Sequence, residues 1–132
     1  MKTKLVLVVG LMALLTAVSG YARQTQPSVI KAQVDFPFIV EGKTLPAGMY
    51  EFSRPDLSSD FRVTGPDHKG VLAPIMTRLS GEMHTTPQDS HLIFDKVGEI
   101  CYLSEIWIPG EDGFLLFAAK GIHTHKVLNV KY

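Results

Sequence analysis

The stretch that decides the fold covers residues 30–40 and reads Ile30-Lys31-Ala32-Gln33-Val34-Asp35-Phe36-Pro37-Phe38-Ile39-Val40. Every even position is apolar, and most odd positions are polar. Successive side chains of a β-strand point to opposite faces, so this alternation predicts a strand with one buried face. Pro37 has no backbone N–H, which predicts a sheet edge or a bulge at this point.

Short apolar or alternating segments recur along the rest of the chain, separated by turns at intervals of roughly 8–12 residues. The first two of these turns are Glu41-Gly42-Lys43 and Leu45-Pro46-Ala47-Gly48, which contain glycine and proline. Together with 30–40, the segments expected to form strands are 49–53, 61–64, 71–79, 92–94, 100–108, 114–119 and 123–132. The pattern predicts an all-β, single-domain antiparallel β-sandwich or barrel of about eight short strands.

Two segments are less regular. A short helix stays open as an alternative for 114–119, because Gly121 could cap it. Residues 80–90 have no apolar rhythm and are expected to form a surface loop.

The segment 100–108 is apolar on both of its faces, which predicts a central strand that is covered on both sides. Strict alternation puts Trp107 on the same face as Cys101. We therefore expect Trp107 to be largely buried, together with Phe36 and Phe38. Cys101 is the single cysteine, and its apolar neighbours indicate a buried, unreactive thiol.

The first residues have the composition of a secretory signal peptide. Two lysines, Lys2 and Lys4, precede an apolar run of 14 residues from Leu5 to Val18. This run is shorter than the ~18 apolar residues that a membrane span needs. The small residues Gly20 and Ala22 occupy the −3 and −1 positions of a cleavage site after Ala22.

Cleavage there predicts a signal peptide of residues 1–22 and an all-β domain of residues 23–132, exported to the periplasm or secreted. An uncleaved membrane anchor is the alternative, and the shortness of the apolar run disfavours it. We expect no stable membrane span after cleavage.

The composition of the exported domain limits its partners. Cleavage removes 22 of the 132 residues and two lysines, which leaves 110 residues with 11 basic and 13 acidic side chains. A net charge of −2 provides no electrostatic attraction to nucleic acid or to an anionic membrane. One cysteine allows no internal disulfide, so the packing of one hydrophobic core must hold the fold.

His123-Thr124-His125 is the pattern with the most chemical content. Two histidines at positions i and i+2 of a strand point to one face, about 6.6 Å apart at Cα, and can converge on a metal ion. The opposite face carries Leu128 and Val130, so both histidines are expected to face solvent. Two imidazoles alone hold a divalent metal weakly, and an exposed pair without metal is therefore the competing interpretation.

A third ligand could come only from another part of the chain. The candidates are Glu82, His84, His91 and Asp95. Any of them would serve only if the fold brings it to the histidine pair.

Other chemical signatures are absent from the sequence. There is no Gly-x-Ser-x-Gly nucleophile motif, and Glu105, the one acid inside an apolar strand, is expected to form an ion pair or to reach water. We therefore favour an exported binding or structural module with an unidentified protein or small-molecule partner, and without a catalytic residue or cofactor. The alternative is a metal-binding protein or a metal-dependent enzyme that uses His123 and His125. A small-ligand barrel that resembles lipocalins is a third interpretation.

Three segments resemble a family of small exported bacterial proteins without an assigned activity. They are Val34-Asp35-Phe36-Pro37-Phe38, Lys43-Thr44-Leu45-Pro46-Ala47-Gly48-Met49-Tyr50 and Leu103-Ser104-Glu105-Ile106-Trp107-Ile108-Pro109-Gly110. The resemblance implies an exported all-β domain and supplies no catalytic residue.

Overall fold

A computed structural model of the chain describes residues 29–55, 58–80, 90–108, 111 and 113–130. The predicted signal peptide and most of the predicted 80–90 loop lie outside these residues. Within them the chain forms eleven β-strands and no α-helix. The strands are β1 (Val29–Val34), β2 (Phe38–Val40), β3 (Lys43–Leu45), β4 (Gly48–Ser53), β5 (Asp60–Thr64), β6 (Gly70–Pro74), β7 (Thr77–Leu79), β8 (His91–Val97), β9 (Ile100–Trp107), β10 (Gly113–Leu115) and β11 (Thr124–Asn129).

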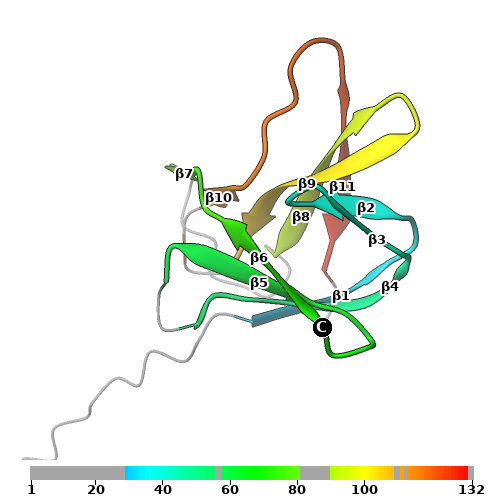
Figure 1. Cartoon of the computed structure of the whole chain (residues 1–132). Coiled ribbons are helices and arrows are strands. Elements are labelled where there is room, and N and C mark those ends of the chain that lie inside the picture. Colours follow the sequence, from blue (N-terminus) through cyan, green and yellow to red (C-terminus); the bar gives the residue numbers. More distant parts are fainter. Residues whose placement is uncertain (1–28, 56–57, 81–89, 109–110, 112, 131–132) are drawn as a thin grey trace, which may run out of the picture.

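The strands form two sheets that face each other as a β-sandwich (Figure 1). One sheet has the order β1-β4-β5-β6, and the other has the order β11-β8-β9-β10-β7. β2 and β3 belong to the second sheet, where β2 lies along β9. All strand pairs are antiparallel except β2 with β9, which meet in parallel at Ile39 and Tyr102. The predicted all-β sandwich is therefore confirmed.

Residues 30–40 form two strands instead of the single predicted one. β1 ends at Val34 in the first sheet and β2 begins at Phe38 in the second, so the chain changes sheet around Pro37. A proline cannot donate a hydrogen bond to a neighbouring strand, which accounts for the break. The even positions remain buried on both sides of it. Phe36, at the break itself, is partly buried and packs against the core, so it is less buried than Phe38.

Residues 71–79 also form two strands in different sheets, and the chain changes sheet after Pro74. β6 ends there in the first sheet, and β7 belongs to the second. The Ile75 N–H donates to Ser59 O, and the next N–H, of Met76, donates to Leu115 O of the other sheet. These two divided segments, together with β3, account for eleven strands where about eight were expected.

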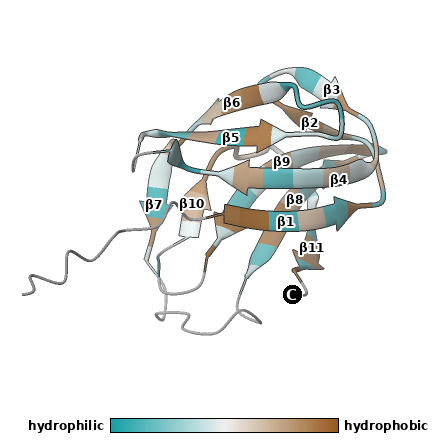
Figure 2. Cartoon of the chain, turned by 90° about the horizontal axis from the view of Figure 1, so that it is seen from below, coloured by the Kyte–Doolittle hydropathy of each residue, from teal (hydrophilic) through white to brown (hydrophobic). Residues whose placement is uncertain are grey.

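The core lies between the two sheets. Hydrophobic and hydrophilic residues alternate along the strands, as Figure 2 shows, and the buried apolar side chains come from both sheets. Phe38 and Phe94 are fully buried and pack edge to face, with ring centroids 5.5 Å apart. The predicted burial of Phe38 and Cys101 is confirmed.

A β-bulge changes which side chains of β9 face the core. The register of β8 against β9 slips by one residue at Ser104. Cys101 and Leu103 are buried before the slip, and Ile106 is buried after it. Trp107 therefore lies on the outer face and is only half-buried, so its predicted place in the core is wrong.

The Pro46-Ala47-Gly48-Met49-Tyr50 segment has a structural role. Tyr50 is 3% exposed, and its hydroxyl donates to Pro46 O at 2.5 Å. A tyrosine that bonds back to the backbone a few residues upstream fixes a corner in many Greek-key sandwiches. Burial, and next the charge of Asp67, raise the pKa of the Tyr50 phenol above its usual value. The hydrogen bond from Tyr50 to Pro46 therefore fixes the turn at the start of β4.

Candidate metal centre

The pairing of β11 with β8 brings His125 to Asp95. The two residues are directly opposed in the antiparallel register, so their side chains lie on the same face. Leu128 and Val130 pack on the core side, and His125 faces away from the core, as the alternation predicted. The His125 side chain is 59% exposed and that of Asp95 only 2%. His125 Nδ1 lies 2.9 Å from Asp95 Oδ1.

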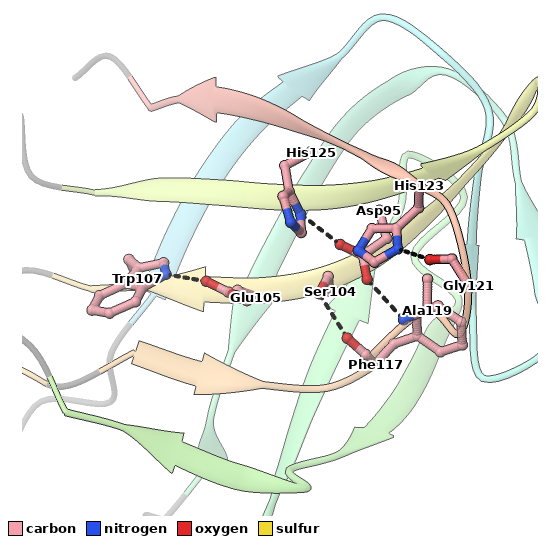
Figure 3. A network of polar contacts seen from close by, with 9 residues as sticks. All are labelled: Asp95, Ser104, Glu105, Trp107, Phe117, Ala119, Gly121, His123 and His125. Carbon is pink, nitrogen blue, oxygen red and sulfur yellow. Dashed lines mark hydrogen bonds and ion pairs between the residues drawn. The ribbon is translucent and has the colours of Figure 1, made fainter.

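Asp95 is buried although it lies on the outer face, because the chain crosses over it between β10 and β11. Most of this connection, residues 116–122, forms a long arch in Figure 1, and we call these residues the covering segment. The Ala119 N–H donates to Asp95 Oδ2 at 2.9 Å. Asp95 thus accepts one hydrogen bond on each oxygen, and both donors are visible in Figure 3. Such bonds are what a buried carboxylate requires.

The bulge at Ser104 anchors the covering segment. Ser104 O accepts hydrogen bonds from the N–H groups of Leu116 and Phe117, and the Ser104 hydroxyl donates to Phe117 O at 2.6 Å. The Phe117 ring stacks on Tyr102, with centroids 4.6 Å apart and planes 14° from parallel. These contacts fix the path of the chain just before it reaches Asp95.

His123 lies beside this pair, two residues before His125. Its Nδ1 is 2.8 Å from Gly121 O, and the two histidine rings meet edge to face with centroids 4.9 Å apart. Gly121 has φ +83°, in the left-handed region that glycine adopts without strain. The turn at Gly121 therefore directs the chain so that its own carbonyl reaches the His123 ring.

The hydrogen bonds assign the ring protons of both histidines. A carbonyl oxygen only accepts, so His123 Nδ1 carries a hydrogen, and a neutral His123 ring has its free lone pair on Nε2. In the same way, His125 Nδ1–H donates to the Asp95 carboxylate. Figure 3 shows the His123 nitrogen that is not bonded to Gly121 on the side of Asp95 and His125.

Asp95, His123 and His125 together have the composition of a metal site. One ligand atom from each residue can be chosen so that all three lie within 4.8 Å of one another. Metal bonds of about 2.0–2.2 Å bring neighbouring ligand atoms to roughly 3–3.5 Å. Binding of a metal by His125 Nδ1 would require this nitrogen to lose its proton, so the metal would replace the hydrogen bond to Asp95 Oδ1. Hydrogen bonds to the second ring nitrogen, as His123 has with Gly121, are the usual way in which proteins orient metal-binding histidines.

The four residues that the sequence offered as a third ligand have different positions. Asp95 is at the histidine pair. His91 lies elsewhere on the outer face, where its ring stacks on Trp107 at 5.5 Å. Glu82 and His84 lie outside the described residues. Glu105, expected to form an ion pair or to reach water, accepts a hydrogen bond of 2.8 Å from Trp107 Nε1.

No known protein family, curated protein or solved structure matches the chain. Within the described residues, no helix is both long enough and apolar enough to cross a membrane. The chemistry of Asp95, His123 and His125 therefore has to be argued from their geometry.

Proposed function

We propose that the protein is a metal-binding module that holds one divalent transition-metal ion through Asp95, His123 and His125. The observation that supports this most directly is the buried Asp95 carboxylate, which the β8–β11 register brings within 2.9 Å of His125. The His-x-His pattern by itself supplies two ligands, and two imidazoles hold a metal weakly. Asp95 raises the number of protein ligands to three, and durable metal centres usually have three or four.

The ligands indicate the class of metal. Two imidazole nitrogens and one carboxylate oxygen suit Zn²⁺, Ni²⁺, Cu²⁺ and Fe²⁺, whereas Ca²⁺ and Mg²⁺ prefer oxygen ligands throughout. The exposed His125 keeps the centre open to solvent. Water or a ligand atom from another molecule would complete the coordination. This combination fits a protein that takes up and releases a metal.

Binding is favoured over catalysis because binding needs only ligands and access to solvent. A metal-dependent enzyme would also need a pocket for its substrate beside the metal. A groove of about 700 Å³ is lined by other residues, among them Lys43, Pro66 and Tyr50. A metal-dependent reaction therefore remains the second candidate.

Elemental analysis tests the proposal. The purified protein is loaded with Zn²⁺, dialysed and analysed, and we expect close to one equivalent of retained zinc. The double variant His123→Ala, His125→Ala should lose it. His68→Asn removes an exposed histidine in the β5–β6 turn and is the matched control, because asparagine tolerates the φ of +59° found there. Retention of zinc by the double variant, or none in the wild type, would contradict the proposal.

We also propose that the module works outside the cytoplasm, after cleavage behind Ala22. The charged start, the 14-residue apolar run and the small residues before the cleavage point support this. Intact-mass measurement of the protein from the exporting cell tests it. A species that begins at Arg23 is expected, and one that retains residues 1–22 would contradict export by this route.

A further inference from the structure

A buried arginine lies at another end of the sandwich, apart from the metal centre. Arg54 follows β4 and is 5% exposed. Its Nε is buried and has no hydrogen-bond partner among the described residues. An arginine side chain keeps its charge at any pH that a folded protein tolerates, so burial without a partner is costly.

A second arginine reaches the same place from the other sheet. Arg78 in β7 is directly opposite Phe114 in β10. The guanidinium carbon of Arg54 lies 4.9 Å from the centre of the Phe114 ring, and that of Arg78 lies 5.3 Å from it. Phe114 is fully buried, and Phe61 packs against it edge to face. The two cations therefore share one aromatic ring.

Among the described residues, no anion accompanies these two cations. The face of the Phe114 ring attracts both cations, but it offers no hydrogen-bond acceptor to the buried Arg54 Nε–H. Within the described residues, no carboxylate forms an ion pair with Arg54 or Arg78. The two like charges also repel each other, so nothing described explains why they are kept together.

We propose that Arg54 and Arg78 bind an oxyanion, a phosphate, sulfate or carboxylate group, beside Phe114. A guanidinium group presents a planar fork of N–H donors that fits two oxygens of such a group. Arg78 is exposed and gives the anion access from solvent, whereas Arg54 supplies the buried donor. The site is independent of the metal centre, because the two share no residue.

Inorganic phosphate is the probe for a test by NMR of the arginine side chains. Phosphate is added at constant ionic strength set with chloride, and the Arg54 Nε–Hε resonance is followed. We expect a saturable shift. Phosphate affinity should fall at least tenfold in Arg54→Lys and severalfold in Arg78→Gln. Arg62→Gln, which removes an exposed arginine of β5, is the control and should leave the affinity unchanged.

Three results would overturn the proposal. The first is an Arg54 resonance that does not respond to phosphate in the wild type. The second is an equal response in all variants, which would indicate a general salt effect. The third is a phosphate affinity that stays unchanged in Arg78→Gln, because Arg78 would then take no part in binding. Arg78→Gln changes an exposed residue, so it keeps the test decisive if Arg54→Lys does not fold.

Discussion

His125 and Asp95 are paired across two neighbouring strands although 30 residues separate them in the sequence. The exposed imidazole donates to the buried carboxylate, which also accepts the Ala119 N–H of the covering segment. The Asp95 side chain thus connects its own strand β8 to the edge strand β11 and to the covering segment. A substitution at Asp95 should therefore affect metal binding and the position of the covering segment together.

Replacement of Phe38 by alanine should cost about 3–5 kcal/mol of unfolding free energy, because the ring is fully buried against Phe94. Phe36→Ala should cost clearly less, since Phe36 is only partly buried and has Lys126 Nζ over its ring at 3.9 Å. Denaturant titration of both variants checks this order. Equal losses would contradict the change of sheet at Pro37.

Gly113→Ala should destabilise the protein by about 1–3 kcal/mol, the usual cost of forcing an extra group into a packed site. An added Cβ would lie 2.6 Å from the Trp107 ring, which packs flat on the glycine. Trp107 is the single tryptophan, so its fluorescence reports the displacement directly. Gly70→Ala is the control, because its Cβ would have the flexible Arg62 side chain as its nearest neighbour, at 3.2 Å, and Thr64 Oγ1 at an ordinary contact distance of 3.6 Å. An unchanged Trp107 emission in Gly113→Ala would count against the described packing.

Tyr50 should make the fold sensitive to alkali. Its pKa is raised in the folded protein by burial and by Asp67, whereas an unfolded tyrosine ionises near pH 10. The folded state therefore holds the phenol proton more tightly, so this contribution to stability is complete below pH ~10 and decreases as the pH rises further.

Tyr50→Phe removes the hydrogen bond to Pro46 O and should cost about 1 kcal/mol at neutral pH. Its unfolding free energy should decrease less above pH ~10 than that of the wild type. Urea titrations of both proteins between pH 8 and 11 measure the difference. Parallel pH profiles would show that the Tyr50 proton is not held more tightly in the folded state.

Local alternation predicted the fold class but not the strand boundaries. The period-2 pattern of residues 30–40 identified the buried face correctly on both sides of Pro37. Whether a proline ends a strand or only bends it depends on where the next hydrogen-bond partner lies, which a local pattern does not contain. The bulge at Ser104 is a similar case, because it changed the orientation of Trp107 through the pairing of β8 with β9.

The metal centre also has a part that the local pattern predicted and a part that depends on tertiary structure. The His-x-His spacing placed two side chains on the outer face without any tertiary information. Asp95 was one of four candidates for the third ligand, and no local pattern distinguished it from the other three. Its place opposite His125 depends on the pairing of distant strands, and its burial depends on the covering segment. A single acid inside the apolar stretch of β8 was the only local signal.

The zinc affinity of Asp95→Asn shows whether the Asp95 carboxylate is a metal ligand. Asparagine has the size of aspartate but lacks its charge, so the strand can remain in place while the third ligand is lost. The dissociation constant is measured by competition with a chromophoric chelator, with Trp107 fluorescence as the check that the variant is folded. The account predicts one zinc site in the wild type and an affinity at least ~10–100-fold weaker in Asp95→Asn. Equal zinc affinity in the two folded proteins would contradict it.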